Sequence, residues 1–188
     1  MNQFKYYKQW GGVWLCLAFL AGCSSTPIQF HTLMPLPTDT PSDQQEKVVV
    51  ESVSVPPQVN RTELVVREDA SGLLILESEW WGSSLPEEIQ SALTARLDGP
   101  RTPHPVRAWV TVSRFDTIVG QAAWLEAEFR LSVTQDQNGR MTCSFRQKST
   151  AGDSVTSLVL AHQDNVETLA QRIAEAARQL KQGQTHCP

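Results

Sequence analysis

The clearest pattern of apolar and polar positions in the chain is a strict alternation over residues 123–133. Six apolar side chains share one face of this segment: Ala123, Leu125, Ala127, Phe129, Leu131 and Val133. Successive side chains of a strand point to opposite faces, so the alternation predicts a strand with one face on a core and one in water, as in an antiparallel sheet. Asn138-Gly139 is a typical hairpin turn. The strand expected to return over residues 140–148 places Met141, Cys143 and Phe145 on one face.

Four further apolar runs predict strands over residues 47–55, 62–67, 73–76 and 106–115. The first run is rich in valine and stops at Pro56-Pro57, which cannot continue a paired strand. The polar turn of residues 68–72 is typical of a hairpin between the second and third runs. A short apolar segment at residues 30–33 predicts an additional edge strand.

Two stretches have the period of amphipathic helices. The first begins with a capping box of Ser84 and Glu87 and ends at residues 98–100, Asp-Gly-Pro. We expect the second to begin at a capping pair of Asp164 and Glu167 and to end at Gly183, whereas residues 155–160 fit either a strand or a helix. The order β-β-β-α-β-β-β-α predicts an α+β fold, with a mostly antiparallel sheet and two amphipathic helices packed on one face.

The N-terminus has the pattern of a bacterial lipoprotein signal. Lys5 and Lys8 precede an apolar run that is too short to span a membrane, and Leu20-Ala21-Gly22 leads directly to Cys23. We expect cleavage after residue 22 and a lipid on the thiol of Cys23. The alternative, an ordinary secretory signal with an incidental cysteine, leaves the small residues before Cys23 unexplained.

Ser24 follows the expected lipidated residue. In Gram-negative envelopes aspartate at this position favours retention in the inner membrane, so Ser24 predicts an outer-membrane lipoprotein that faces the periplasm. Residues 23–46 contain four prolines and many small polar residues, and we expect most of them to form a flexible tether. Residues 47–188 would then form a single domain with one core.

Charge and cysteine content restrict the possible chemistry. Removal of the signal leaves 14 basic residues against 20 acidic ones, and no basic patch of the type that binds nucleic acid. Cys143 and Cys187 remain for a periplasmic disulfide, the alternative being two free thiols. The spacing of cysteine and histidine fits no metal site, no motif indicates a cofactor, and no catalytic constellation is recognisable. We expect solvated side chains for Glu88 and for His31, His104, His162 and His186.

Tryptophan supplies the candidate interface residues. Trp80 and Trp81 are adjacent where a strand leads into a helix, so both cannot easily face one core. We expect one in the core and the other in an interface, where tryptophan is enriched. Trp124 lies on the polar face of its strand and Trp109 opposite a valine face, and either one is a candidate oligomer contact.

Taken in order, several segments resemble the ABC-type transport auxiliary lipoproteins, most closely the paraquat-inducible protein C branch. They are the lipobox, Phe30-His31-Thr32-Leu33, residues 53–67, residues 80–85 (WWGSSL), Arg114-Phe115-Asp116 with Gly120, and the terminal helix. The resemblance implies a non-enzymatic part of an envelope system that carries lipids between two membranes. It also implies a periplasm-spanning partner with MCE domains, and self-association into a ring that docks this partner at the outer membrane.

Two other functions compete with this interpretation. A periplasmic carrier would hold phospholipid in its own pocket, but we expect two helices packed on one sheet to cover the apolar faces that such a pocket needs. An envelope hydrolase would require a catalytic role for Glu87 or His104. A sister branch of the family, which serves ATPase-driven MCE systems, would change the inner-membrane partners and leave the role almost unchanged.

Overall fold

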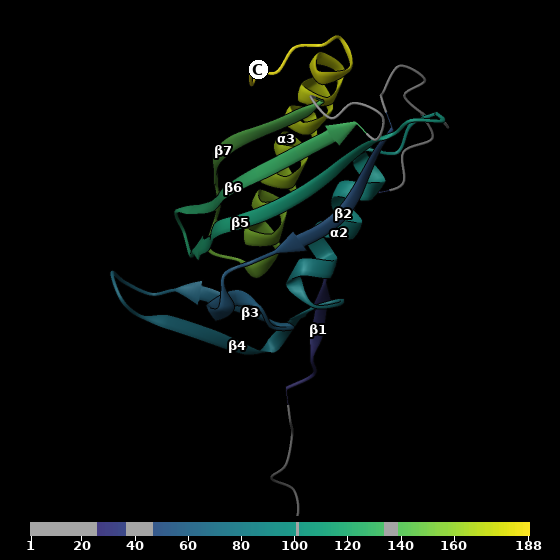
Figure 1. The fold of residues 1–188 in the computed structure, drawn as a ribbon. Coiled ribbons are helices and arrows are strands. Elements are labelled where there is room, and N and C mark those ends of the chain that lie inside the picture. The colour runs from purple at the N-terminus through teal and green to yellow at the C-terminus, as the bar shows by residue number, and fades with distance from the viewer. Residues whose placement is uncertain (1–25, 37–46, 101, 134–138) are drawn as a thin grey trace, which may run out of the picture.

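The computed structural model describes residues 26–36, 47–100, 102–133 and 139–188. In this part of the chain a seven-stranded mixed, mostly antiparallel sheet packs against two helices (Figure 1). The elements are β1 (Gln29–His31), β2 (Val48–Ser54), β3 (Glu63–Arg67), β4 (Leu73–Trp81), α2 (Leu85–Arg96), β5 (Val106–Ile118), β6 (Ala122–Val133), β7 (Arg140–Thr150) and α3 (Val155–Lys181). The predicted α+β class is confirmed, and β1 is the edge strand expected near residues 30–33.

The sheet has the order β1-β4-β3-β5-β6-β7. The strands β5, β6 and β7 form the antiparallel meander that the alternating pattern predicts. Two strands pair with the same edge of β5. Its first half pairs with β2 in parallel, and its end pairs with β3 in parallel at Arg67–Ile118. The strand β1 adds to the far side of β4, also in parallel.

A bulge in β5 changes which side chains reach the core. The register with β6 shifts between Val112 and Arg114, so Ser113 is an extra residue in the strand. Before the bulge the buried positions are the even-numbered ones that end at Val112. After it, Phe115 and Thr117 are buried instead. The simple alternation expected for residues 106–115 therefore holds only as far as the bulge.

The helices begin at different kinds of cap. In α2 the predicted capping box is present, and the backbone N–H of Ser84 donates to the Glu87 carboxylate at 3.2 Å. The expected start of α3 at Asp164 and Glu167 is wrong, because the helix already begins at Val155. Its N-cap is Ser154, whose hydroxyl accepts from the backbone N–H of Ser157 at 3.2 Å.

The core lies between the sheet and the two helices. Figure 1 shows α3 running along β5, β6 and β7, with α2 beside it and next to β2. One continuous cluster joins the inward faces of these elements, and its largest fully buried members include Leu33, Leu85, Ile89, Leu93, Leu125, Phe129, Leu131, Leu169 and Ile173. Leu33 lies outside the expected domain of residues 47–188, so the segment around β1 is part of the fold.

Candidate functional site

The segment that follows β1 is held by side chains from both helices. The Oε2 atom of Glu88 accepts hydrogen bonds from the Thr32 hydroxyl at 2.8 Å and from the Leu33 backbone N–H at 2.9 Å. Gln163 of α3 donates to the Thr32 carbonyl at 2.8 Å, and Arg96 of α2 donates to the Leu33 carbonyl at 3.2 Å. We call Glu88, Arg96 and Gln163 the N-terminal clamp, because they fix the chain shortly after Cys23.

The burial of Glu88 contradicts the expectation of a solvated side chain, since only 6% of it is exposed. Its position in the first turn of α2 places the carboxylate near unpaired backbone N–H groups, which favours negative charge. Gly82 makes room for it, because a Cβ atom there would lie 2.9 Å from Oε1 of Glu88. A buried carboxylate needs hydrogen-bond donors, and the segment after β1 supplies two of them.

The strand β1 is joined to β4 by side chains as well as by backbone. His31 Nε2 lies 2.5 Å from the Glu79 carboxylate, and the backbone N–H of Gly82 donates to the His31 carbonyl at 2.8 Å. His31 is half-buried rather than solvated. The N-terminal clamp and these contacts together bind the segment on both sides.

One member of the tryptophan pair lies in the core, and the interface role expected for the other stays a prediction. Trp81 is buried and meets Phe115 edge-on, with ring centroids 6.2 Å apart. Trp80 points to the other face of β4, where its ring meets Phe30 edge-on at 6.3 Å. Trp81 is therefore unavailable as an interface residue, whereas Trp80 is half-buried and keeps part of its ring accessible.

The face of the sheet opposite the helices carries tryptophans that are covered by cations. The guanidinium of Arg114 lies 4.5 Å from the centroid of Trp124, and Lys148 Nζ lies 5.1 Å from it. Arg130 lies 4.7 Å from the centroid of Trp109 in the same manner. Such stacked pairs present amphipathic surface and are common in protein interfaces.

Asp116 forms ion pairs with two arginines on this open face of the sheet. Asp116 accepts from Arg67 at 2.9 Å and from Arg114 at 2.7 Å. Partial burial opposes ionisation of Asp116, yet the two guanidinium groups outweigh it and hold the pKa of this carboxyl below its usual value. Arg114 also contacts Glu126 at 3.3 Å. The charges therefore orient the ring-stacked Arg114 over Trp124.

His162 is buried, which contradicts the expectation of a solvated histidine. Its ring stacks on Phe115 with centroids 3.9 Å apart, and Nε2 lies 2.8 Å from the Thr117 hydroxyl. Burial lowers the pKa of His162 to about 3, and the charge of Asp116 opposes this shift only weakly. The expectation for His162 was wrong because it assumed a helix that begins at Asp164. Since α3 begins at Val155, His162 lies within the helix, on the side that faces the sheet. His104 and His186 are exposed, as expected.

The predicted disulfide between Cys143 and Cys187 is present, with a Cα–Cα distance of 5.7 Å. Cys143 lies on the core-facing side of β7, as the alternation predicts. The bond fixes the end of the chain beside β7, where a hollow of about 170 Å³ is lined by residues that include Arg146, Arg172 and Pro188.

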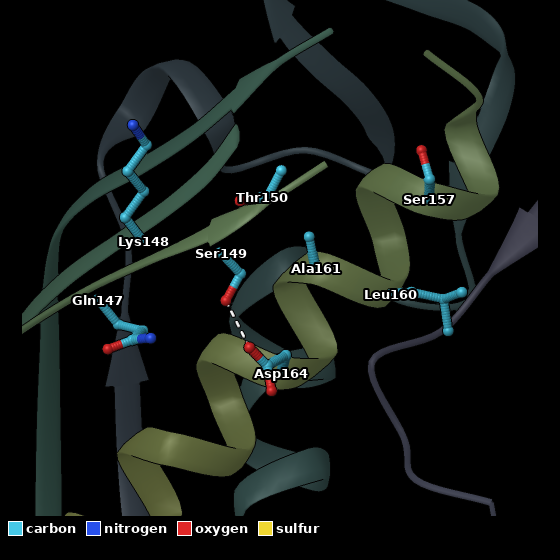
Figure 2. Close-up of a pocket in the computed structure, with 8 residues that line it drawn as sticks. All are labelled: Gln147, Lys148, Ser149, Thr150, Ser157, Leu160, Ala161 and Asp164. Atoms are coloured by element: carbon cyan, nitrogen blue, oxygen red, sulfur yellow. Dashed lines mark hydrogen bonds between the residues drawn. The ribbon is translucent and has the colours of Figure 1, made fainter. Parts of the chain in front are cut away.

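A second hollow, of about 510 Å³, lies between the end of β7 and the first turns of α3. Figure 2 shows its lining, with the Ser149 hydroxyl donating to Asp164 at 2.5 Å. The hollow is open to solvent, and most of its lining side chains are polar. It is too open and too polar to shield an acyl chain from water.

The polar residues beside this hollow do not form a catalytic arrangement. Ser149 contacts Asp164 and Asn165, whereas Nε2 of His162 contacts Thr117 and its Nδ1 has no partner. No serine–histidine pair therefore forms here. Among the described residues no group of three metal-binding side chains occurs. Neither helix in the described ranges combines the length and apolarity of a membrane span.

The comparisons with known proteins identify the class. The family model described as the ABC-type transport auxiliary lipoprotein component matches residues 30–174. The chain therefore belongs to this family, whose members are lipoproteins that assist ABC-type transport systems and are generally non-catalytic. A search of curated proteins found no significant match.

Two solved structures share the fold. One is described only as an uncharacterized protein, with 18% identity and a TM-score of 0.65, and the match covers 80% of this chain and 98% of the other. The second is protein XCC0632 from Xanthomonas campestris, of family DUF330. It has 16% identity and a TM-score of 0.59, and the match covers 84% of this chain and 98% of the other.

Sequence reasoning missed the N-terminal clamp. Arg96 and Gln163 look like ordinary polar helix residues, and Glu88 looks like a second acidic residue in a first turn. One signal was available, since the glycine after the tryptophan pair leaves space for a buried group. Cys23 and Ser24 lie outside the described residues, so their assignment remains a prediction.

Proposed function

We propose that this protein is an outer-membrane-anchored, non-enzymatic component of an MCE-type intermembrane lipid transport system. It holds the periplasm-spanning MCE partner at the outer membrane. The family match over residues 30–174 carries this proposal. The match begins seven residues after Cys23, the residue that we expect to carry the lipid. The paraquat-inducible protein C branch is the part of the family that we propose for it.

The lipid anchor at Cys23 and the sorting residue Ser24 define the location in this proposal. Three acyl chains on one cysteine would hold the protein firmly, since each buried methylene contributes about 0.8 kcal/mol. The N-terminal clamp fits such a role, because a load on an anchored domain passes through the segment that the clamp fixes. We assign the protein to the outer membrane because Ser24 follows the lipidated cysteine, whereas aspartate at this position would favour the inner membrane.

Docking of the MCE partner would use the open face around Trp124. This ring lies between Arg114 of β5 and Lys148 of β7, so it gathers charge and apolar area from three neighbouring strands. Aromatic and arginine side chains are enriched among residues that dominate binding energy. The alternative of a lipid carrier finds no support in the two hollows, which are open and largely polar.

Co-purification tests the proposal. The full-length lipoprotein is expressed with the MCE protein encoded nearest to it, extracted in mild detergent and captured by a tag on the MCE protein. We expect co-elution of the wild type and at least a tenfold loss for Trp124→Ala. Leu160→Ala removes an exposed apolar side chain of α3, away from this face, and is the control. A lipoprotein that never co-elutes with an MCE protein would contradict the proposal.

A further inference from the structure

The end of the sheet that receives the N-terminus has apolar side chains exposed to solvent. Phe30 is 68% exposed and Ile28 is 46% exposed, and the half-buried Trp80 lies edge-on to Phe30. We propose that Ile28, Phe30 and Trp80, the membrane-facing cluster, insert into the headgroup region of the bilayer that holds the lipid on Cys23. The proposal rests on the proposed anchor at Cys23 and adds an orientation to it.

Chain length restricts how far this cluster can lie from the bilayer. Six peptide units separate Cys23 from Gln29, and a fully extended chain spans at most about 3.3–3.6 Å per residue, or roughly 20 Å here. From Gln29 onward the backbone pairs with β4, and Leu33 is fully buried. A free tether of residues 23–46 would instead permit roughly 75 Å. The anchor therefore keeps β1 beside the membrane surface.

The N-terminal clamp prevents the cluster from moving away by local unfolding of β1. Glu88, Arg96 and Gln163 together make four hydrogen bonds of 3.2 Å or less to Thr32 and Leu33. The His31–Glu79 contact adds a fifth connection on β4. The docked segment thus behaves as a rigid part of the domain.

The chemistry of the cluster fits a lipid interface. The Trp80 indole donates to the Glu77 carbonyl at 2.9 Å, so its polar atom is satisfied while the ring remains available. A tryptophan ring with a satisfied polar atom is suited to the membrane–water boundary, and the wholly apolar ring of phenylalanine can insert beside it. Glu77 and Glu79 lie nearby and no lysine or arginine belongs to the cluster, so the contact depends on apolar insertion rather than on anionic lipids.

A second copy of the chain is the competing occupant. The other exposed apolar residues of β4 are Leu73, Leu74 and Ile75, which lie at the opposite end of this strand from Trp80. Their side of β4 is an unpaired strand edge, which is the usual surface for strand pairing between copies. Self-association therefore has a separate surface, and the membrane-facing cluster remains available for lipid.

Fluorescence quenching in vesicles tests the proposal. The mature lipoprotein is inserted into phosphatidylethanolamine–phosphatidylglycerol vesicles that contain phosphatidylcholine brominated on its acyl chains near the headgroup. Of the tryptophans at positions 80, 81, 109 and 124, we expect bromine to quench chiefly Trp80. Trp80→Phe should abolish most of the quenching, whereas Trp124→Phe, the matched control, should preserve it. Ile28→Ser with Phe30→Ser should reduce quenching at least twofold, and 0.5 M salt should leave it unchanged.

The outcomes separate this inference from the proposed anchor. Mass spectrometry and flotation show whether Cys23 carries lipid, and a non-lipidated chain that does not float overturns both proposals. A floating, lipidated protein without quenching of Trp80 overturns only the membrane-facing cluster. A smaller oligomer in the Ile28→Ser/Phe30→Ser variant, with quenching unchanged, assigns the cluster to a protein contact and also overturns it. Thermal melting checks that each variant is folded.

Discussion

Glu88 and His162 are buried polar side chains that connect helices to other parts of the fold. Glu88 binds the segment after β1, and His162 binds Thr117 of β5. A buried polar group is costly when its partner is lost, so such contacts favour one arrangement of the chain. The two residues act at different places, one beside the segment that follows β1 and one beneath α3.

Glu88→Ala should destabilise the protein and release the segment around β1. The change leaves the Leu33 N–H and the Thr32 hydroxyl without their acceptor, which costs about 1–3 kcal/mol for each buried group that water cannot reach. Hydrogen exchange measured by mass spectrometry should show faster exchange in residues 29–34. Urea unfolding should show a lower free energy of unfolding.

The control for this prediction is Glu68→Ala, which removes an exposed carboxylate in the turn between β3 and β4. It should change neither the exchange of residues 29–34 nor the urea midpoint by more than the error of measurement. Unchanged exchange in Glu88→Ala would show that the N-terminal clamp does not hold the segment.

His162 should make the stability depend on pH in the acid range. Its pKa is about 3 in the folded chain and near 6.5 in the unfolded chain, so the unfolded state binds one more proton between these values. The free energy of unfolding is unaffected above pH 6.5. It falls as the pH drops from 6.5 toward 3, by up to about 1.4 kcal/mol per pH unit. Urea unfolding at pH 4, 5, 6 and 7 measures the slope.

The double variant His162→Phe with Thr117→Val removes the titrating group and its partner together. Replacing both ends of a buried hydrogen bond with apolar groups of similar shape leaves no unsatisfied atom. We expect its slope between pH 4 and 6 to fall by about one proton relative to the wild type. Asp116 still titrates in both proteins, so an unchanged slope would show that His162 is not buried in its neutral form.

At the scale of elements, α3 and β7 are joined by the disulfide at the end of the chain. Cys143 and Cys187 are separated by 44 residues, a span that contains the whole of α3. A covalent link across such a loop restricts the unfolded chain, and removing it typically costs about 2–5 kcal/mol. The disulfide therefore stabilises the packing of α3 on the meander.

Cys187→Ala should lower the midpoint of thermal unfolding, and dithiothreitol should lower that of the wild type to a similar value. The physical reason is the added freedom of the unfolded chain rather than the loss of tail contacts, since the tail is exposed. Calorimetry with and without dithiothreitol measures both effects. The variant is its own control, because its midpoint should no longer respond to the reductant.

At the scale of the whole molecule, the described part of the sheet has several strand edges that no other strand covers, at β1 with β4, at β2 and at β7. In the described residues β1 covers only positions 79–81 of β4, and β7 pairs only with β6. Edges of this kind pair readily with another chain, and a contact between two different edges produces a ring when the rotation closes. We propose that these edges carry the self-association into a ring that the family resemblance implies.

Ile75→Lys should weaken self-association at least tenfold, because it places a charge in the exposed apolar part of the β4 edge. Light scattering after size-exclusion chromatography of the detergent-solubilised lipoprotein measures the mass. Leu160→Lys adds the same charge on an exposed position of α3 and should leave the mass unchanged. A wild type that is monomeric at every concentration would contradict the ring.

Much of this architecture could be predicted from periodicity alone. The meander of β5, β6 and β7 alternates apolar and polar residues, and the pairing of Cys143 with Cys187 follows once one cysteine is placed on the buried face. The capping box at Ser84 and Glu87 is likewise local. Such features depend on a few neighbouring residues, whose spacing is visible in the chain.

The tertiary structure decided what depends on contacts between distant segments. The bulge at Ser113 and the burial of Glu88 and His162 each require a partner that lies many residues away. The start of α3 at Val155 has a local cap, Ser154, but residues 155–160 fit a strand equally well until their packing is known. Leu33 shows the same limit, because a short apolar segment among prolines resembles a tether until its core site is known. The sequence thus determined the fold class and the expected cellular location. Packing between distant segments determined that the N-terminal segment around β1 is bound into the domain.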